Sequence, residues 1–261
     1  MLGGEREGVL MGDAILAGPD FGVKVCRYMT SISANLQDVR TRIANAAAAA
    51  GRSPGEIALL AVSKTWPAGC VAQAAAAGQR LFGENYVQEG VAKIGELRSL
   101  GLEWHFIGPL QSNKTRPVAE SFDWVHSIDR LKLAQRLSEQ RDASLPPLNV
   151  CIQVNVSGEA SKSGVAPGEA RVLAREVAAL PRIRLRGLMC IPEPTDDERL
   201  LRSRFATLRG LRDELNAEGL ALDTLSMGMS HDLEAAIAEG ATMLRVGTAI
   251  FGAREVRKGE T

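Results

Sequence analysis

The sequence is poor in aromatic residues, cysteines and uncompensated charge, and each shortage excludes a class of protein. Aromatic residues make up 4% of the 261 positions, and 31 basic residues are balanced by 31 acidic ones. A formal charge of zero gives no electrostatic reason to expect nucleic acid or an anionic membrane surface as a partner. The cysteines, Cys26, Cys70, Cys151 and Cys190, have spacings that suit reduced thiols and indicate neither disulfides nor a metal site.

Long apolar runs are also missing. No run approaches the roughly 18 residues of a membrane span, and the amino terminus lacks the basic-then-apolar order of a secretion signal. We therefore expect a soluble, cytoplasmic protein. Residues 1–30 are glycine-rich and show no clean hydrophobic period, so we predict a disordered extension there and one folded domain over 31–256.

The folded part begins with a helical pattern. From Ser33, the expected N-cap, Leu36, Val39 and Ile43 recur at helical spacing until Gly51 provides a stop. Short β-rich runs then alternate with helical patterns, among them helices over 130–142 and 169–180. The predicted strands span 57–63, 80–83, 104–108, 124–128, 149–155, 183–189, 224–227 and 243–247.

Eight strand–helix units predict an α/β protein with a single closed (β/α)8 barrel and an extra N-terminal helix. The alternative is an open, doubly wound parallel sheet. The first strand-to-helix turn, residues 64–67, reads Lys-Thr-Trp-Pro and lacks the glycine fingerprint of a dinucleotide-binding fold. The barrel is therefore favoured.

Lys64 stands at the carboxyl end of the first apolar strand. A lysine that leaves a buried layer is partly desolvated, which favours the neutral amine needed to form an imine with an aldehyde. The alternative is a solvated lysine in a surface turn. Lys162 lies in a loop and follows no apolar strand directly, so it is the weaker candidate for imine formation.

Small donors follow the last two predicted strands, where barrels commonly bind phosphate. Residues 226–230 (SMGMS) and 247–252 (GTAIFG) contain glycines that let backbone N–H groups approach an anion, and Ser226 and Thr248 add hydroxyl groups. Either segment could be an ordinary turn. Closure of the barrel places both near Lys64, at a separation that suits pyridoxal phosphate (PLP), whose aldehyde and phosphate lie on one small ring.

Alternation along the last strand points Arg245 into the barrel with Met243 and Gly247, while Leu244 and Val246 face the helices. A guanidinium offers only donors, so an inward arginine needs an acceptor. The pyridine nitrogen of PLP would provide one, and a barrel carboxylate is the alternative.

Other polar residues have structural explanations. His105 and His126 lie in strand-like runs and are interpreted as hydrogen-bonded core residues without a catalytic role. We expect Gln153 and Asn155 to face the interior beside Cys151. The segment of His231, Asp232 and Glu234 is predicted to begin a helix, where carboxylates complement the helix dipole.

Several ordered blocks together resemble the YggS/PROSC family of PLP homeostasis proteins over about residues 33–255. These blocks are AVSK (61–64), GENYVQE (83–89), HFIGPLQSNK (105–114), GLM (187–189), SMGMS (226–230) and RVGTAIFG (245–252). The resemblance implies a barrel like the N-terminal domain of alanine racemase, the type III fold of PLP proteins. Residues 1–30 fall outside the family pattern.

The resemblance also implies roles for individual residues. Lys64 would carry PLP as an imine, Arg245 would contact the ring nitrogen, and Asn85 would lie near the ring. Ser226, Gly247 and Thr248 would bind the phosphate. No catalytic residue and no metal site follow from it.

We therefore predict a monomeric protein that binds PLP reversibly and buffers or delivers it inside the cell, in transient contact with PLP-dependent apoenzymes. An amino-acid racemase or decarboxylase that uses PLP is an alternative, and it would need an opposing acid or base over the ring. An imine-forming aldolase acting on a sugar phosphate is the third hypothesis, for which Lys64 on the first strand would be an unusual position.

Overall fold

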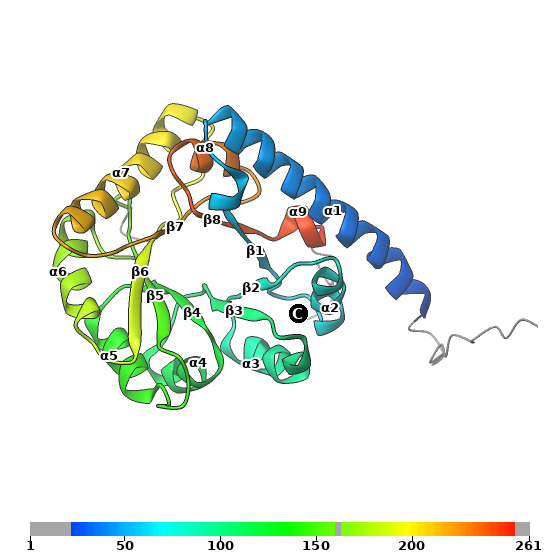
Figure 1. Ribbon diagram of the computed structural model, residues 1–261, viewed down its shortest axis with the longest axis horizontal. Helices are drawn as coiled ribbons and strands as arrows, with labels where there is room; N and C mark the ends of the chain where they lie inside the picture. The colour runs from blue at the N-terminus through cyan, green and yellow to red at the C-terminus, as the bar shows by residue number, and fades with distance from the viewer. Residues whose placement is uncertain (1–21, 160–162, 254–261) are drawn as a thin grey trace, which may run out of the picture.

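The computed structural model describes residues 22–159 and 163–253, in which eight parallel strands close into a barrel (Figure 1). Each strand pairs with the next one along the chain, and the last pairs with the first. The strands are β1 (Ala58–Val62), β2 (Leu81–Glu84), β3 (Glu103–Phe106), β4 (Trp124–Ile128), β5 (Leu148–Gln153), β6 (Ile183–Met189), β7 (Thr224–Ser226) and β8 (Met243–Val246). The predicted barrel is confirmed, and every strand end lies within two residues of its predicted position.

Helices surround the barrel on the outside (Figure 1). They are α1 (Gly22–Ala49), α2 (Ala68–Ala76), α3 (Val87–Glu96), α4 (Thr115–Ser121), α5 (Leu131–Gln140), α6 (Pro167–Ala178), α7 (Glu198–Ala217), α8 (Leu233–Ala238) and α9 (Thr248–Phe251). The helices predicted over 130–142 and 169–180 are confirmed as α5 and α6. Across the described ranges, no helix combines the length and apolar character that crossing a membrane requires.

α1 begins earlier than predicted. Its buried stripe starts at Ile32, which is 1% exposed, and continues through Leu36 and Val39 at helical spacing. Because Ile32 already packs into the core, the helix runs through the exposed Ser33, and the prediction of an N-cap there is wrong. Residues 22–30, predicted as part of a disordered extension, belong to this helix. Residues 1–21 lie outside the described residues.

The end of α1 agrees with the prediction. Gly51 has φ +67°, in the left-handed region that favours glycine. The N–H of Arg52 donates to the carbonyl of Ala47 at 2.9 Å, and the N–H of Gly51 donates to that of Ala48 at 3.1 Å. This pair of bonds is the Schellman arrangement, which satisfies the last carbonyls of the helix.

The two faces of the strands pack against different layers. Leu244 and Val246 of β8 join the large apolar core beneath the helices. Trp124, Cys151 and Met189 form a separate buried cluster. Strand alternation places this cluster inside the barrel, since successive side chains of a strand point to opposite faces.

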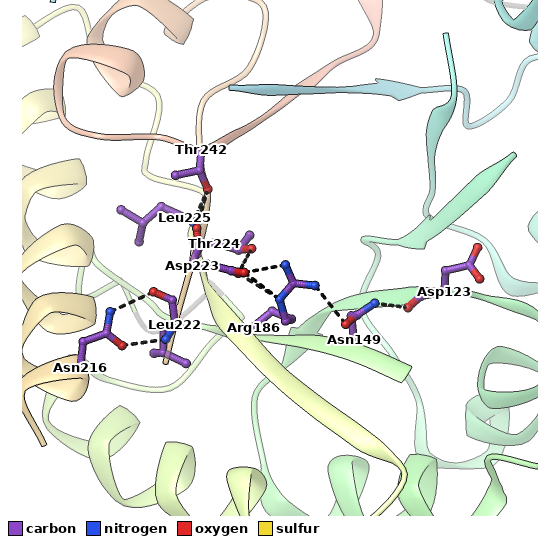
Figure 2. Close-up of polar contacts among 9 residues, drawn as sticks. All are labelled: Asp123, Asn149, Arg186, Asn216, Leu222, Asp223, Thr224, Leu225 and Thr242. Carbon is purple, nitrogen blue, oxygen red and sulfur yellow. Dashed lines mark hydrogen bonds and ion pairs between the residues drawn. The ribbon is translucent and has the colours of Figure 1, made fainter. Parts of the chain in front are cut away.

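A polar layer lies where the strands begin, at the amino-terminal mouth. Figure 2 shows Arg186 of β6 between Asp223 and Asn149. Its guanidinium lies 2.6 Å from an Asp223 carboxylate oxygen, donates to Asn149 Oδ1 at 3.2 Å, and lies 4.8 Å from the centroid of the Trp124 ring. These contacts tie β4, β5 and β6 to the segment before β7, so the amino-terminal mouth is braced by polar side chains.

Candidate functional site

A pocket of about 250 Å³ lies at the opposite mouth, where the strands end. Its lining residues are Val62, Lys64, Trp66, Asn85, Ile107, Ile191, Met229, Ser230, His231, Arg245, Gly247, Thr248 and Gly252. Five of the six residues predicted to bind PLP are among them. Ser226 is the exception.

Lys64 and the segment after β8 meet because the barrel closes. β1 pairs with β8 through Leu60 with Arg245 and Ala61 with Val246. Lys64 follows β1 by two positions, and Gly247 and Thr248 follow β8 directly, so a primary amine and the start of α9 share one pocket. The first N–H groups of any helix lack intrahelical acceptors. The pocket thus combines an amine with donors suited to an anion.

Gly247 and Thr248 form a narrow part of this wall. A Cβ atom on Gly247 would lie 3.1 Å from the carbonyl oxygen of Val62, tighter than most real contacts, so a side chain there would force β1 and α9 apart. Behind them, Trp66 and Phe251 stack with ring centroids 6.0 Å apart. The absence of a side chain on Gly247 therefore keeps the backbone of α9 close to β1.

Arg245 is buried, at 4% exposure, and points into the barrel as predicted. Its Nη1 donates to the Ser226 carbonyl at 2.6 Å and the Ser226 hydroxyl at 2.8 Å, and its Nη2 donates to the Cys190 carbonyl at 2.8 Å. No carboxylate forms an ion pair with it among the described residues, so the alternative of a barrel salt bridge is wrong there. Neutral groups therefore orient this cation, and Arg245 also lines the pocket.

Asn85 follows β2 and contributes an unsatisfied acceptor. Its Oδ1 is buried without a hydrogen-bond partner in the described structure. Buried polar atoms of this kind usually have a partner, so this acceptor is unusual in the wall of the pocket. Gly108 lets the backbone of Asn85 approach closely, because a Cβ atom on Gly108 would lie 2.3 Å from the Asn85 carbonyl oxygen.

Ser226, predicted to bind the phosphate, does not line the pocket. It is the last residue of β7 and fully buried, and its hydroxyl is 2.8 Å from both His126 Nδ1 and Arg245 Nη1. The strand directs this side chain into the interior beneath the pocket. Ser230 lines the pocket instead, beyond a turn in which Gly228 has φ +93°. That glycine could have indicated which of the two serines reaches the mouth.

The interpretation of His105 and His126 as core residues is confirmed. Both are fully buried, and their rings are joined by a 2.9 Å contact from His105 Nδ1 to His126 Nε2. His105 Nε2 lies 3.0 Å from a Glu103 carboxylate oxygen. Burial lowers the pKa of His105 and places the pKa of His126 well below its usual value. Both rings are therefore neutral at physiological pH.

The direction of the hydrogen bonds in this chain is fixed at both ends. Arg245 can only donate, and the Glu103 carboxylate, whose pKa is lowered chiefly by the bond from His105, can only accept. Neutral rings between them must each carry the proton on Nε2. Hydrogen bonds thus run from Arg245 through Ser226, His126 and His105 to Glu103.

The remaining candidates lie away from the pocket. Gln153 is buried and donates to the Ser163 carbonyl at 3.2 Å. Asn155 accepts from the N–H of Gly158 at 3.1 Å and donates to the Glu159 carbonyl, so it orders a loop instead of facing the interior. Neither residue lines the pocket.

The cysteines in the described residues are buried thiols. Cys70, Cys151 and Cys190 are unpaired, and burial raises the pKa of Cys151 and Cys190 to about 12, so neither is a nucleophile.

The segment predicted to begin a helix leads into α8, which starts directly after Asp232. No cluster of metal-ligating side chains occurs in the ranges 22–159 and 163–253. Lys162 lies outside the described residues.

Comparisons with known proteins show the family to which the chain belongs. Residues 34–255 match the family model described as the N-terminal domain of alanine racemase. The pyridoxal phosphate homeostasis protein of Pseudomonas aeruginosa is 64% identical over 227 residues, which cover 87% of this chain and 97% of that one. The protein of the same name from Escherichia coli K12 is 57% identical over 237 residues, covering 88% of this chain and all of that one.

A solved structure from the same comparisons also resembles this chain. PipY of Synechococcus elongatus PCC7942, solved with PLP bound, is 39% identical and superposes with a TM-score of 0.74 over 85% of this chain and 100% of that one. The family model begins within α1 and extends beyond α9. The chain therefore belongs to the family of pyridoxal phosphate homeostasis proteins, on the fold of the alanine racemase N-terminal domain.

Proposed function

We propose that the protein binds PLP at the carboxyl-terminal mouth, attached to Lys64, and that it holds the cofactor for PLP homeostasis. The observation that carries the proposal is that Lys64, Arg245 and Thr248 line one pocket across the closure of the barrel. Bound PLP would supply an aldehyde able to condense with a primary amine. Relatives that share 57–64% of the sequence are named for PLP homeostasis.

The residues of the pocket fit the separate groups of PLP. Lys64 supplies the amine, while Arg245, held by carbonyls and a hydroxyl instead of a carboxylate, supplies a donor for the pyridine nitrogen. Asn85 lines the pocket and would lie near the ring. Gly247 and Thr248 would bind the phosphate, and the position of Ser230 supports it as the serine donor in place of Ser226.

An arginine at the ring nitrogen also bears on chemistry. Because a guanidinium donates without transferring its proton, it leaves the nitrogen unprotonated and weakens the ring as an acceptor of carbanion charge. This disfavours demanding amino-acid chemistry and agrees with a holding role, for which the relatives are named. Transient contact with PLP-dependent apoenzymes, a monomeric state and a cytoplasmic location stay predictions.

The attachment to Lys64 is tested by absorbance and reduction. Protein mixed with PLP should develop the visible band of an imine, and borohydride should fix the cofactor to the peptide that contains Lys64. Lys64→Ala should lose both, whereas Lys132→Ala, which removes an exposed lysine of α5, should retain them. A full band in Lys64→Ala would contradict the assignment.

The holding role is tested separately from attachment. Protein loaded with PLP is incubated with L-alanine, and the D-isomer and carbon dioxide are followed over time. We expect no sustained turnover. Catalytic turnover by the loaded wild type, absent in Lys64→Ala, would refute a non-enzymatic role and favour the racemase or decarboxylase.

A further inference from the structure

Thr65, next to Lys64, has a backbone conformation that threonine rarely adopts. Its φ is +68°, in the left-handed region, where a β-branched side chain is strained. Such a conformation persists only where surrounding contacts determine it, and it is concentrated at functional sites. The contacts that hold Thr65 therefore show what fixes the chain beside Lys64.

The main contact to Thr65 from elsewhere in the chain comes from α3. The N–H of Thr65 donates to Glu89 Oε1 at 2.6 Å, across 24 positions of sequence. The same carboxylate oxygen accepts from Lys93 Nζ at 2.7 Å. Glu89 and Lys93 lie one turn apart on α3, the spacing that favours an ion pair on one helix face.

Lys93 also holds the residue on the other side of Lys64. Its Nζ donates to the Ser63 carbonyl at 2.8 Å and to Glu84 Oε1 at 2.8 Å. The Ser63 hydroxyl donates to the same oxygen of Glu84 at 2.6 Å. An ammonium has three donors, and all three are used here.

This cluster is buried but separate from the pocket. The side chain of Lys93 is 6% exposed and that of Glu84 is fully buried, while Glu89 is 27% exposed. None of the three lines the pocket, so their contacts to Ser63 and Thr65 act on the backbone around Lys64 and leave a ligand untouched. Ion pairs screened from water are weakened little by salt. The two neighbours of Lys64 are thus fixed to one rigid group.

We propose that Glu89 and Lys93 are positioning residues that clamp residues 63–65 and so hold the Lys64 amine in the pocket. The proposal rests on the proposed attachment of PLP to Lys64. Glu89 stabilises the strained φ of Thr65, and Lys93 links Glu89 to Ser63 and Glu84. With the backbone fixed in advance, less conformational freedom is lost when the Lys64 amine condenses with the aldehyde to form an imine and release water, and the equilibrium favours attachment.

The clamp makes a specific prediction about rescue by glycine. Glu89→Ala should weaken PLP binding about tenfold, which corresponds to about 1.4 kcal/mol, because Thr65 loses its stabilised conformation. Glycine adopts positive φ without strain. The double variant Thr65→Gly with Glu89→Ala should therefore bind PLP more tightly than Glu89→Ala alone, but more weakly than wild type, because glycine relieves the strain and also makes the backbone more flexible. Affinity is measured by titrating PLP and following the imine band.

Matched controls separate positioning from general stability. Glu96→Ala removes an exposed carboxylate at the end of the same helix and should bind PLP like wild type. Circular dichroism and thermal melts establish that each variant is folded. Wild-type affinity in Glu89→Ala would overturn the clamp, and so would a double variant that binds no better than Glu89→Ala alone.

A second measurement needs no cofactor. Acetic anhydride labels lysines in the cofactor-free protein, and mass spectrometry compares the rate at Lys64 with that at exposed Lys132. In Glu89→Ala the Lys64 rate should move toward the Lys132 rate, and in the double variant it should move part of the way back toward the wild-type value. An unchanged rate would overturn the clamp. Failure of borohydride to fix PLP to Lys64 in wild type would instead refute the attachment itself.

Discussion

At the scale of single residues, the barrel interior contains ionisable groups whose charge state is decided by burial. Burial lowers the pKa of Arg245, but a guanidinium stays charged in proteins, whereas His105 and His126 lose their charge because the interior disfavours a cation. A protonated His126 would also stand in the field of Arg245, which lowers its pKa further. The histidines therefore bind protons less readily in the folded protein than in the unfolded chain.

This difference makes stability depend on pH. An unfolded histidine has a pKa of about 6.5, and the folded pKa values lie lower, so below about pH 6.5 the unfolded chain takes up protons that the native state does not. The free energy of unfolding should then fall, by up to about 1.4 kcal/mol per pH unit for each histidine, until the folded pKa is reached. Urea unfolding at about pH 7 and about pH 5.5 measures the loss.

Substitutions test whether His105 and His126 cause this loss in the free energy of unfolding. His126→Asn removes one titrating group, so its loss between the two pH values should be smaller than that of wild type. Gln37→Ala, which changes an exposed residue that carries no ionisable group, should lose as much as wild type. The lowered pKa of Glu103 acts in a separate window, because its stabilising effect disappears only below its usual pKa of 4.5. Equal losses in wild type and His126→Asn would contradict the assignment.

At the scale of elements, α1 supports the wall of the pocket from outside the barrel. Its apolar stripe, from Ile32 to Ala47, is buried, and the side chain of Asn35 donates to the Ile250 carbonyl in α9 at 2.9 Å. Since α9 begins at Thr248 in the pocket wall, the packing of α1 also fixes a part of the site. The extra N-terminal helix is therefore a structural component of the barrel.

Truncation of the stripe should destabilise the protein. Leu36 is fully buried, so Leu36→Ala removes apolar contacts and leaves a cavity that the surrounding helices fill only partly. We expect the free energy of unfolding to fall by about 2–5 kcal/mol. Gln37→Ala, at the exposed neighbouring position, should change it by less than about 0.5 kcal/mol. Equal urea midpoints for the two variants would show that the stripe adds little to stability.

The sequence predicted elements well because their signals are local. Apolar runs and their spacing gave the eight strands, and closure of the barrel then brought Lys64 next to Gly247 and Thr248. The start of α1 was missed because Ser33 resembles an N-cap, while the burial of Ile32 that overrides it is a tertiary contact.

Contacts between distant elements were less predictable. The inward direction of Ser226 depends on where β7 ends and the following turn begins, a matter of one or two residues. The link from Glu89 to Thr65 depends on how α3 is rotated against the loop after β1, which no local pattern encodes. Sequence therefore indicated which segments form the pocket better than it indicated which side chains support it.

At the scale of the whole molecule, one chain of hydrogen bonds connects the two mouths of the barrel. It starts at Glu103, whose side chain is 43% exposed at the amino-terminal mouth, and ends at Arg245 in the pocket. The stacking of His105 on Trp124, with ring centroids 5.3 Å apart, and the position of Arg186 over Trp124 keep the first part of this chain in place. The braced mouth and the pocket are thus one connected polar system.

Glu103→Gln should weaken PLP binding at the pocket, although Glu103 lies at the opposite mouth of the barrel. An amide both donates and accepts, so His105 is no longer restricted to one tautomer, and the negative charge that polarises the chain toward Glu103 is lost. Ser226 then becomes a weaker acceptor for Arg245, and we expect PLP to bind roughly two- to fivefold more weakly, as followed by titration of the imine band. Glu120→Gln, which changes an exposed carboxylate on α4, should bind like wild type. Identical affinities for these two variants would mean that Arg245 is held by the Ser226 and Cys190 carbonyls alone.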